Sequence, residues 1–438
     1  MGAVPHPVYP TDPEMSSTES VYIHPEQLCL GLYVRLELDW TAHPFTFNQF
    51  KIKNQSQIDT LRALGLERIR VDMKRSEATP LPPPTDLSAL TPVKPSEAEM
   101  SAITAKKERV LKLAKHRAAL NECERKFMGA TRAVKSITRN LFARPEESMS
   151  EARALVSDLV DSMLTDRDIA IHLMNDKLGG EDVYYHQLNV AVLALMVGKQ
   201  LNLPRESLME LGVGAMFHDI GKVELPEKLL LKTEPLTPSE QDLMMRHVDY
   251  GLEIGKKLGL SPEALAIVFQ HHEFTDGTGY PHGLQGEGIL PLSKIIAVVN
   301  TYDNLCNRPN LRDSLTPYEA LSVMFAQYRN RFETQPLSTF IRCMGVFPPG
   351  SLVQLSNNAL GLVMAVNSSK PLKPTVMIYD PSVPKHEAII LDLEEETELS
   401  IIKSIRPALL PQQVFNYLNP RKRMTYYADT GANKVANT

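Results

Sequence analysis

The chain has 438 residues, of which 43% are hydrophobic and 23% charged, a composition typical of globular proteins with two or three domains. Its formal net charge of −5 provides no general basic field for binding nucleic acid. Cys29, Cys123, Cys306 and Cys343 lie far apart and fit reduced thiols better than a disulfide framework. No secretory signal or membrane-spanning apolar run is evident, so we expect a cytoplasmic protein.

The N-terminal part of the chain predicts a tail and a small accessory module. Residues 1–19 are polar and rich in proline, so we expect a disordered tail. Residues 20–75 combine strand-like alternation with one helical pattern, which predicts a small α/β module. The two strand-like segments and the helix occupy residues 30–38, 68–72 and 56–64.

A linker and a charged helix are predicted next. Residues 76–95 are rich in proline, including Pro82-Pro83-Pro84, and this composition is typical of a semi-rigid linker. Residues 96–145 have helical periodicity with an intermittent apolar stripe that includes Leu113, Leu120 and Phe127. One interpretation is an amphipathic helix that covers the next domain. The other is a signalling or dimerising helix that couples the N-terminal module to catalysis in a homodimer.

Residues 146–345 predict an all-α domain, because helical patterns dominate them. Ser261-Pro262 and Thr316-Pro317 each place a capping residue before a proline at the first helical position. The helical patterns cover residues 151–164, 189–200, 239–258, 262–270 and 317–332.

Residues 346–438 predict a small β-rich region that closes the chain. The polar segment Ser356-Asn357-Asn358 separates two apolar runs and indicates a β-hairpin. The expected strands are residues 352–355, 360–364, 375–379 and 388–391.

The helical region contains an unusual set of histidines and one aspartate. Five of the twelve histidines fall between positions 186 and 272. Each one alone is more commonly a core or surface histidine, and the segment Asp276 to Gly279 alone is a tight loop. Together they are unfavourable to bury in a helical bundle unless they bind a metal. The set comprises His186, His218, Asp219, His247, His271 and His272.

The ligand types in this set predict a pair of divalent metals. Imidazole and carboxylate suit Fe, Mn or Zn, and the absence of a nearby thiolate pair disfavours a structural zinc site. Asp219 is the natural bridge, because its two oxygens can reach both metals while His218 binds one. The metals would share a hydroxide that attacks phosphorus in a phosphate ester. Lys222 follows by three residues, so a continuing helix would place its cation on the same face, where it could neutralise phosphoryl charge.

One long signature carries a family resemblance. It comprises His218-Asp219, His271-His272-Glu273 and the ungapped segment from Asp276 to Leu284, which contains Gly279-Tyr280-Pro281. These segments closely resemble the HD-GYP phosphodiesterases of bacteria, a branch of the HD metallophosphohydrolase superfamily, over residues 150–345. The N-terminal module is similar to the uncharacterised domain that often precedes such catalytic domains. The resemblance implies an HD-type helical bundle as the catalytic core and hydrolysis of cyclic di-GMP to pGpG and, in many members of the family, onward to GMP.

The resemblance also implies roles for individual residues. Lys222 would contact a phosphate of the substrate, and Arg308 and Arg312 fall near the basic substrate-binding motif, with one extra residue in the spacing. The Gly279-Tyr280-Pro281 loop would shape the lip of the pocket and face a regulatory partner, such as a GGDEF-type protein. The implied metals are Fe or Mn, two or three in number. Their ligands would be His186, His218 and Asp219 for the first, Asp219, His247, His271 and His272 for the second, and Asp182 for a third.

Asn300 is a departure from the family pattern, which has aspartate at this position. An amide oxygen can coordinate a metal, but it is neutral and a poorer ligand for a hard cation than a carboxylate. We therefore expect Asn300 to bind the metal weakly and to alter metal occupancy. Asp303 lies nearby and is equally well explained as a polar helix residue. This departure leaves open a receptor that binds cyclic di-GMP or a partner protein without catalysis, and a third alternative is hydrolysis of another nucleotide.

Overall fold

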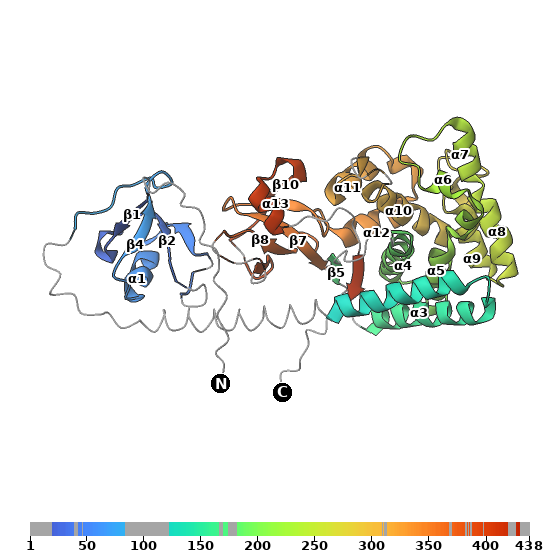
Figure 1. The fold of residues 1–438 in the computed structure, drawn as a ribbon, viewed down its shortest axis with the longest axis horizontal. Coiled ribbons are helices and arrows are strands. Elements are labelled where there is room, and N and C mark those ends of the chain that lie inside the picture. Colours follow the sequence, from blue (N-terminus) through green and yellow to red (C-terminus); the bar gives the residue numbers. More distant parts are fainter. Residues whose placement is uncertain are drawn as a thin grey trace, which may run out of the picture. The chain divides into compact units, whose positions relative to one another are not determined.

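A computed structural model of the chain describes residues 20–38, 43–45, 47–83, 122–165, 170–173, 182–308, 310, 313–367, 370–381, 383, 385, 388–396, 398–418 and 426–429. The predicted tail, most of the predicted linker and the first part of the predicted connecting helix lie outside these residues. The chain divides into two compact units, residues 1–115 and 116–438, which we describe separately (Figure 1).

The N-terminal unit is a small α/β module, as predicted. Its four strands form an antiparallel sheet in the order β1-β4-β2-β3, and helix α1 accompanies the sheet. Leu32, Val34, Leu61 and Val71 have no exposed surface and belong to one apolar core, which explains the period-2 pattern of the strands. The elements are β1 (Ser20–Ile23), η1 (Pro25–Gln27), β2 (Tyr33–Arg35), β3 (Gln49–Lys51), α1 (Gln55–Ala63) and β4 (Ile69–Asp72).

Residues 122–140 form a helix that packs on the helical bundle of the second unit. Phe127, Val134 and Ile137 are each 1% exposed and lie on one face of this helix, at the spacing of an amphipathic helix. Phe127 stacks against Tyr185, with ring centroids 5.7 Å apart. Residues 122–140 therefore form an amphipathic helix that covers the helical domain, which is the first of the two interpretations. The dimerising interpretation stays a prediction.

The second unit is built around a bundle of helices, as predicted. Residues 187–197 of α4 are all buried, so α4 lies at the centre, packed against α3, α5, α10 and α12. The Ser261 side chain accepts a hydrogen bond from the N–H of Ala264, and Thr316 forms a capping box with Glu319. The helices are α3 (Pro145–Thr165), α4 (Asp182–Gln200), α5 (Arg205–Phe217), η3 (Ile220–Glu224), α6 (Glu227–Leu230), α7 (Pro238–Met245), α8 (His247–Lys257), α9 (Pro262–Gln270), η4 (Gly286–Gly288), α10 (Pro291–Cys306), α11 (Pro317–Ala326), η6 (Arg329–Arg331) and α12 (Thr334–Met344).

Several predicted helices differ from the observed ones, and among them α3 and α4 begin earlier in the sequence than predicted. The pattern over 239–258 corresponds to two helices, α7 and α8, which meet at Arg246. The pattern over 317–332 ends earlier, because α11 stops at Ala326 and the 3-10 helix η6 follows. The division into α7 and α8 matters for the site, since it places His247 at the beginning of a helix.

The C-terminal region forms an antiparallel sheet that shares its core with the bundle. The predicted hairpin is present: β6 pairs with β7, and Asn358 has a positive φ of 66° in the turn between them. Leu352, Leu362 and Tyr426 belong to the same apolar cluster as the helical core. The strands are β5 (Ala170–Leu173), β6 (Leu352–Leu355), β7 (Leu360–Asn367), β8 (Thr375–Ile378), β9 (Ile389–Asp392), β10 (Ile401–Ile405) and β11 (Tyr426–Asp429), with η8 (Pro407–Leu409) and α13 (Gln412–Leu418).

Strand β5 makes the region 146–345 less purely helical than predicted. It lies between α3 and α4 in the sequence, yet it pairs with β7 on one side and with β11 on the other. The local sequence does not predict this strand, because both of its partner strands come from the C-terminal region of the chain. Within the described residues, no helix has the length and apolar character needed to cross a bilayer.

Candidate metal centre

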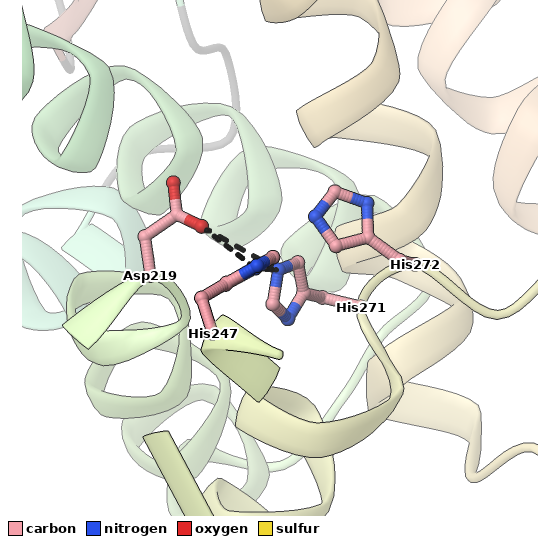
Figure 2. A group of neighbouring side chains, drawn as sticks. All are labelled: Asp219, His247, His271 and His272. Atoms are coloured by element: carbon pink, nitrogen blue, oxygen red, sulfur yellow. Dashed lines mark hydrogen bonds and ion pairs between the residues drawn. The ribbon is translucent and has the colours of Figure 1, made fainter. Parts of the chain in front are cut away.

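Six predicted ligands come together where several helices begin or end. His186 lies in the first turns of α4, and His218 caps the C-terminus of α5 with Asp219 directly after it. His247 begins α8, and His271 caps the C-terminus of α9 (Figure 2). Their ligand atoms form two groups, each with atoms within 4.8 Å of one another. One group is His186, His218 and Asp219, and the other is Asp219, His247, His271 and His272. We call these the first and the second half-site.

Asp219 belongs to both half-sites and directs one oxygen to each. Its Oδ2 lies 3.3 Å from Nε2 of His218 and 3.4 Å from Nε2 of His186. Its Oδ1 lies 3.3 Å from Nε2 of His247 and 3.6 Å from Nε2 of His271. This is the arrangement expected of a carboxylate that bridges two cations.

Three of the histidines are oriented in the same way by their own helices. Nδ1 of His218, His247 and His271 donates to the main-chain oxygen of the residue three positions earlier, over 2.6, 2.7 and 2.8 Å respectively. Because the proton is on Nδ1, Nε2 carries the lone pair and points into the cluster. The sequence folds in this way locally, since each histidine stands at a helix end, where main-chain carbonyls have no intrahelical partner.

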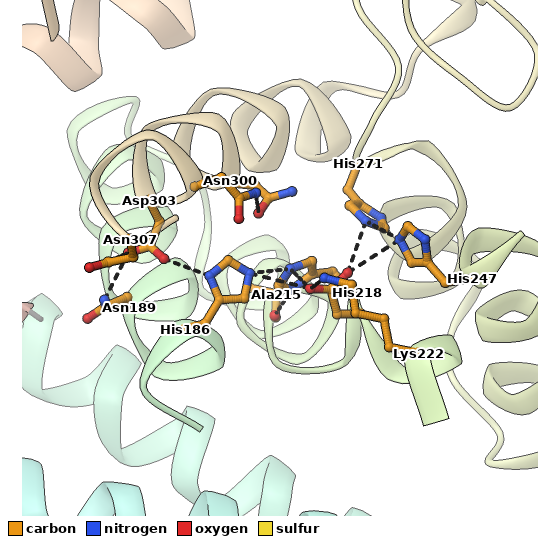
Figure 3. Close-up of polar contacts among 12 residues, drawn as sticks. His186, Asn189, Ala215, His218, Lys222, His247, His271, Asn300, Asp303 and Asn307 are labelled. Carbon is orange, nitrogen blue, oxygen red and sulfur yellow. Dashed lines mark hydrogen bonds and ion pairs between the residues drawn. The ribbon is translucent and has the colours of Figure 1, made fainter. Parts of the chain in front are cut away.

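His186 is oriented differently, by a carboxylate (Figure 3). Its Nδ1 donates to Oδ2 of Asp303 over 2.6 Å. Oδ1 of Asp303 accepts hydrogen bonds from Nδ2 of Asn189 over 2.9 Å and of Asn307 over 3.0 Å. Asp303 is 1% exposed, so this buried carboxylate is compensated by three donors. Asp303 thus has a defined role beside the site and is more than a polar helix residue.

The protonation states suit metal binding in most of the cluster. Burial lowers the pKa of His271 to about 3 and lowers the pKa values of His218 and His272, so these imidazoles are neutral. Burial alone would raise the pKa of Asp219, but Lys222 and His218 lower it well below its ordinary value. Burial also opposes a charge on His186, yet hydrogen bonds to Asp219 and Asp303 raise its pKa to about 9.

The geometry fits cations at the cluster. Nε2 of His186 lies 3.1 Å from Nε2 of His218, and Nε2 of His247 lies 3.2 Å from Nε2 of His271. Nδ1 of each of these four rings donates to a main-chain or carboxylate oxygen, so two lone pairs would face each other across each pair unless a proton or a metal cation lies between the Nε2 atoms. Oδ1 of Asp219 is buried and has no hydrogen-bond partner, which also leaves it available to a metal.

Gly221 allows the two half-sites to approach each other. A Cβ on Gly221 would lie 1.9 Å from the main-chain oxygen of His247 and 2.4 Å from the main-chain nitrogen of Gly251. Only a residue without a side chain lets η3, which follows Asp219, pack this closely against α8. The 3-10 geometry of η3 also brings Lys222 over Asp219, and Nζ donates to Oδ2 over 2.6 Å. The sequence predicted that Lys222 lies beside Asp219 because a continuing helix would place both on one face. The helix ends at Phe217 instead.

Comparisons with known proteins agree with this geometry. Residues 158–335 match the family described as HD domain, residues 20–170 a domain of unknown function (DUF3391), and residues 352–413 a KOW domain associated with HD domain. A cyclic di-GMP phosphodiesterase of Pseudomonas aeruginosa is 30% identical over 360 residues, which cover 81% of this chain and 83% of that protein. The chain belongs to the HD-GYP family. It is an HD-type phosphohydrolase related to cyclic di-GMP phosphodiesterases.

Two further relatives match a smaller part of the chain. The cyclic di-GMP phosphodiesterase response regulator RpfG of Xanthomonas campestris pv. campestris is 31% identical over 37% of this chain and 43% of that protein. A 3'3'-cGAMP-specific phosphodiesterase of Vibrio cholerae serotype O1 is 29% identical over 40% of this chain and 34% of its own length. This chain therefore spans less than half of either protein.

The HD-GYP signature loop packs against the second half-site. The carboxylate of Glu273, which is 1% exposed, accepts hydrogen bonds from the main-chain N–H groups of His282 and Leu284 over 2.7 and 2.8 Å. The rings of Tyr280 and His272 stack with their centroids 4.5 Å apart. The main-chain N–H of Tyr280 donates to the main-chain oxygen of His272 over 3.1 Å. A Cβ on Gly279 would lie 2.4 Å from the same oxygen, so only glycine permits this contact.

Four further residues were expected at the site, namely Asn300, Arg308, Arg312 and Asp182. Asn300 is 2% exposed on α10, and its Oδ1 accepts a hydrogen bond from Nδ2 of Asn304 over 2.8 Å (Figure 3). Arg308 follows α10, and its N–H donates to Oγ of Ser314 over 3.0 Å. Arg312 lies outside the described residues. Asp182 is the first residue of α4, and its side chain is also outside the described part.

Sequence reasoning missed the groups that orient the ligands. Asn189 and Asp303 orient His186, and Gly221 permits the approach of η3 to α8. The spacing of Asn189, three residues after His186 on one helix face, was a usable signal. No local pattern indicates that Asp303, which is 117 positions after His186, is its hydrogen-bond partner.

Proposed function

We propose that this protein is a metal-dependent phosphodiesterase that hydrolyses cyclic di-GMP to pGpG and then to GMP. The observation that carries the proposal is the sharing of Asp219 between two groups of histidines, with one carboxylate oxygen toward each. The similarity of most of the chain to a cyclic di-GMP phosphodiesterase supports the choice of substrate.

The two half-sites suit two divalent metals, because imidazole and carboxylate ligands fit Fe, Mn or Zn, and the family resemblance favours Fe or Mn among them. His186 and His218 would hold one metal, His247, His271 and His272 the other, and Asp219 both. Such a metal pair supplies an activated water and stabilises charge on the phosphate ester. A third metal at Asp182 is a separate proposal.

The chain's own residues would orient the substrate beside this centre. Lys222 is half-buried next to Asp219, and its ammonium group can reach a phosphate oxygen placed over the two half-sites. The stacking of Tyr280 on His272 would keep the Gly279-Tyr280-Pro281 loop at the edge of the second half-site, where it can contact the substrate. Arg308 and Arg312 would contribute further phosphate contacts.

The test is a turnover assay on the full-length protein. Protein purified without oxygen and loaded with Mn²⁺ or Fe²⁺ should cleave cyclic di-GMP, with pGpG and GMP identified as products by chromatography. The substrate panel should include 3'3'-cGAMP, because some relatives are named as specific for it, and kcat/KM for it and for other dinucleotides should be lower than for cyclic di-GMP. Faster cleavage of 3'3'-cGAMP would contradict the assigned substrate, and cleavage of none would contradict the proposed activity.

A receptor without catalysis is the second candidate, and Asn300 is the observation that favours it. Its amide oxygen is buried on α10 and already accepts a hydrogen bond from Asn304, so it is a weaker ligand than the carboxylate of the family pattern. Such a receptor would bind cyclic di-GMP, or a GGDEF-type partner at the Gly-Tyr-Pro loop, while retaining no transition metal. Metal analysis beside a nucleotide-binding measurement separates the two functions. The variant Asn300→Asp should raise metal occupancy if the enzyme interpretation is correct.

A further inference from the structure

A chain of buried hydrogen bonds leads from the C-terminal strand β11 to the first half-site. The main-chain N–H of Tyr426 donates to Oδ1 of Asn189 over 2.8 Å, and Nδ2 of Asn189 donates to Oδ1 of Asp303 over 2.9 Å. Oδ2 of Asp303 then accepts from Nδ1 of His186 over 2.6 Å, as Figure 3 shows for the last two links. Asn189 and Asp303 are each 1% exposed, so bulk water does not compete for these bonds.

The directions of the first two bonds in this chain follow from its first donor, and the direction of the third follows from the carboxylate. A main-chain N–H can only donate, so it must face the amide oxygen of Asn189, which turns the NH₂ group toward Asp303. The carboxylate can only accept, so Nδ1 of His186 carries a proton and Nε2 faces Asp219. If the Asn189 amide were reversed, its oxygen would face a carboxylate oxygen and its NH₂ would face an N–H. Strand β11 therefore selects the amide orientation of Asn189, and the NH₂ group of Asn189 then holds the Asp303 carboxylate that orients His186.

Strand β11 is held in place independently of this chain. The ring of Tyr426 has no exposed surface, and its hydroxyl lies 3.0 Å from the hydroxyl of Tyr302, the residue before Asp303 on α10. The strand also pairs with β5, with Tyr426 opposite Leu173. Its N–H is consequently presented to Asn189 by a fixed backbone.

The first half-site differs in this respect from the second. His218, His247 and His271 are oriented by carbonyls three residues earlier on their own helices. His186 depends on a donor 237 residues beyond Asn189 in the sequence. A change in β11 should therefore reach one half-site and leave the other unchanged.

We propose that Asn189 and the main-chain N–H of Tyr426 are positioning groups for His186, so that docking of β11 controls metal affinity in the first half-site alone. The inference rests on the metal centre of the proposed function and on neither its substrate nor its products. Hydrogen-bond partners of metal-binding histidines typically contribute about 10- to 100-fold in metal affinity, which sets the expected effect.

Titration of the full-length, metal-free protein with Mn²⁺ tests this inference without any substrate. Wild-type protein should bind two ions. Leucine is similar in size to asparagine but has no polar group. Asn189→Leu should therefore lower the affinity for one Mn²⁺ ion by about 10- to 100-fold and leave the affinity for the other unchanged. Tyr426→Phe keeps the N–H and removes only the hydroxyl, so it should lower the melting temperature without altering either affinity.

A second pair of variants tests the N–H itself. Tyr426→Pro and Tyr426→Ala both remove the ring, but only proline also removes the N–H, and proline is tolerated at the first residue of a strand. The proline variant should lose affinity in one half-site relative to the alanine variant. Equal Mn²⁺ affinities of the proline and alanine variants would overturn this inference and leave the metal centre standing. Unchanged Mn²⁺ binding by folded Asn189→Leu protein would do the same. Absence of Mn²⁺ binding by the wild-type protein would overturn the metal centre as well.

Discussion

Lys222 donates a hydrogen bond from Nζ to Oδ2 of Asp219 over 2.6 Å. The side chain of Asp219 is 6% exposed and that of Lys222 is 35% exposed, so the ammonium group covers the carboxylate while still meeting solvent. The cation thus lies beside the oxygen that faces the first half-site, where it can also meet a negatively charged substrate.

Replacement of Lys222 by methionine removes this charge and keeps the length of the side chain. Because a positioned donor near developing phosphoryl charge contributes strongly, we expect kcat on cyclic di-GMP to fall by about 100- to 1000-fold in Lys222→Met. Metal content, measured by elemental analysis, should stay at the wild-type value. Lys228, which is exposed on α6, provides the control, since Lys228→Met should leave kcat unchanged. Equal rates for the two variants would contradict the role of Lys222.

Gly221 should be intolerant of even a methyl group. A Cβ there would lie 1.9 Å from the main-chain oxygen of His247, so Gly221→Ala must push η3 away from α8 and separate Asp219 from the second half-site. We expect a loss of metal binding together with lower stability. Gly129 lies exposed in the helix of residues 122–140 with open space around it, so Gly129→Ala should raise the free energy of unfolding by about 0.5–1 kcal/mol. Metal binding by Gly221→Ala at wild-type strength would show that this close approach is dispensable.

Glu273 should be needed to hold the Gly-Tyr-Pro loop. Its carboxylate accepts two main-chain N–H groups, whereas a glutamine has one oxygen and would turn its NH₂ toward the other N–H. We expect Glu273→Gln to lower the free energy of unfolding by about 1–3 kcal/mol and to increase proteolysis within residues 276–285. The exposed Glu287 in η4 serves as the comparison, because Glu287→Gln should change stability by less than about 0.5 kcal/mol. Similar proteolysis of both variants would refute this role of the carboxylate.

Phe127 tests the covering role of the helix over residues 122–140. The side chain is 1% exposed and stacks on Tyr185, one residue before His186. Phe127→Ala should lower the free energy of unfolding by about 3–5 kcal/mol in a denaturant titration. Phe142, in the turn that follows, is 57% exposed, and Phe142→Ala should have little effect. A small change for Phe127→Ala would instead favour a helix whose main contacts are with another molecule.

Much of the fold could be predicted because its signals are local. The helix α9 begins and ends where Ser261-Pro262 and the apolar pattern place it, and the hairpin of β6 and β7 follows from the polar turn at 356–358. The six clustered ligands could be predicted as a set, because each histidine stands at or near a helix end and their order along the chain matches one family signature.

The rest could not be predicted because it depends on contacts between distant segments. Strand β5 is short, and its partners β7 and β11 lie near the other end of the chain, so nothing near residue 170 indicates a sheet. The bond between Asn189 and Tyr426 spans 237 residues and involves a main-chain N–H that every residue except proline carries. Asn300 could be identified as a departure, but its hydrogen bond to Asn304 needed the structure.

The number of metal ions bound by Asp219→Ala tests the shared carboxylate most directly. Elemental analysis and Mn²⁺ titration should find two ions in the wild-type protein. Because one oxygen of Asp219 faces each half-site, the variant should lose affinity at both, and cyclic di-GMP turnover should disappear with the metals. His218→Ala should weaken the first ion more than the second, which separates loss of one ligand from loss of the bridge. Two ions bound at wild-type affinity by folded Asp219→Ala protein would contradict the account.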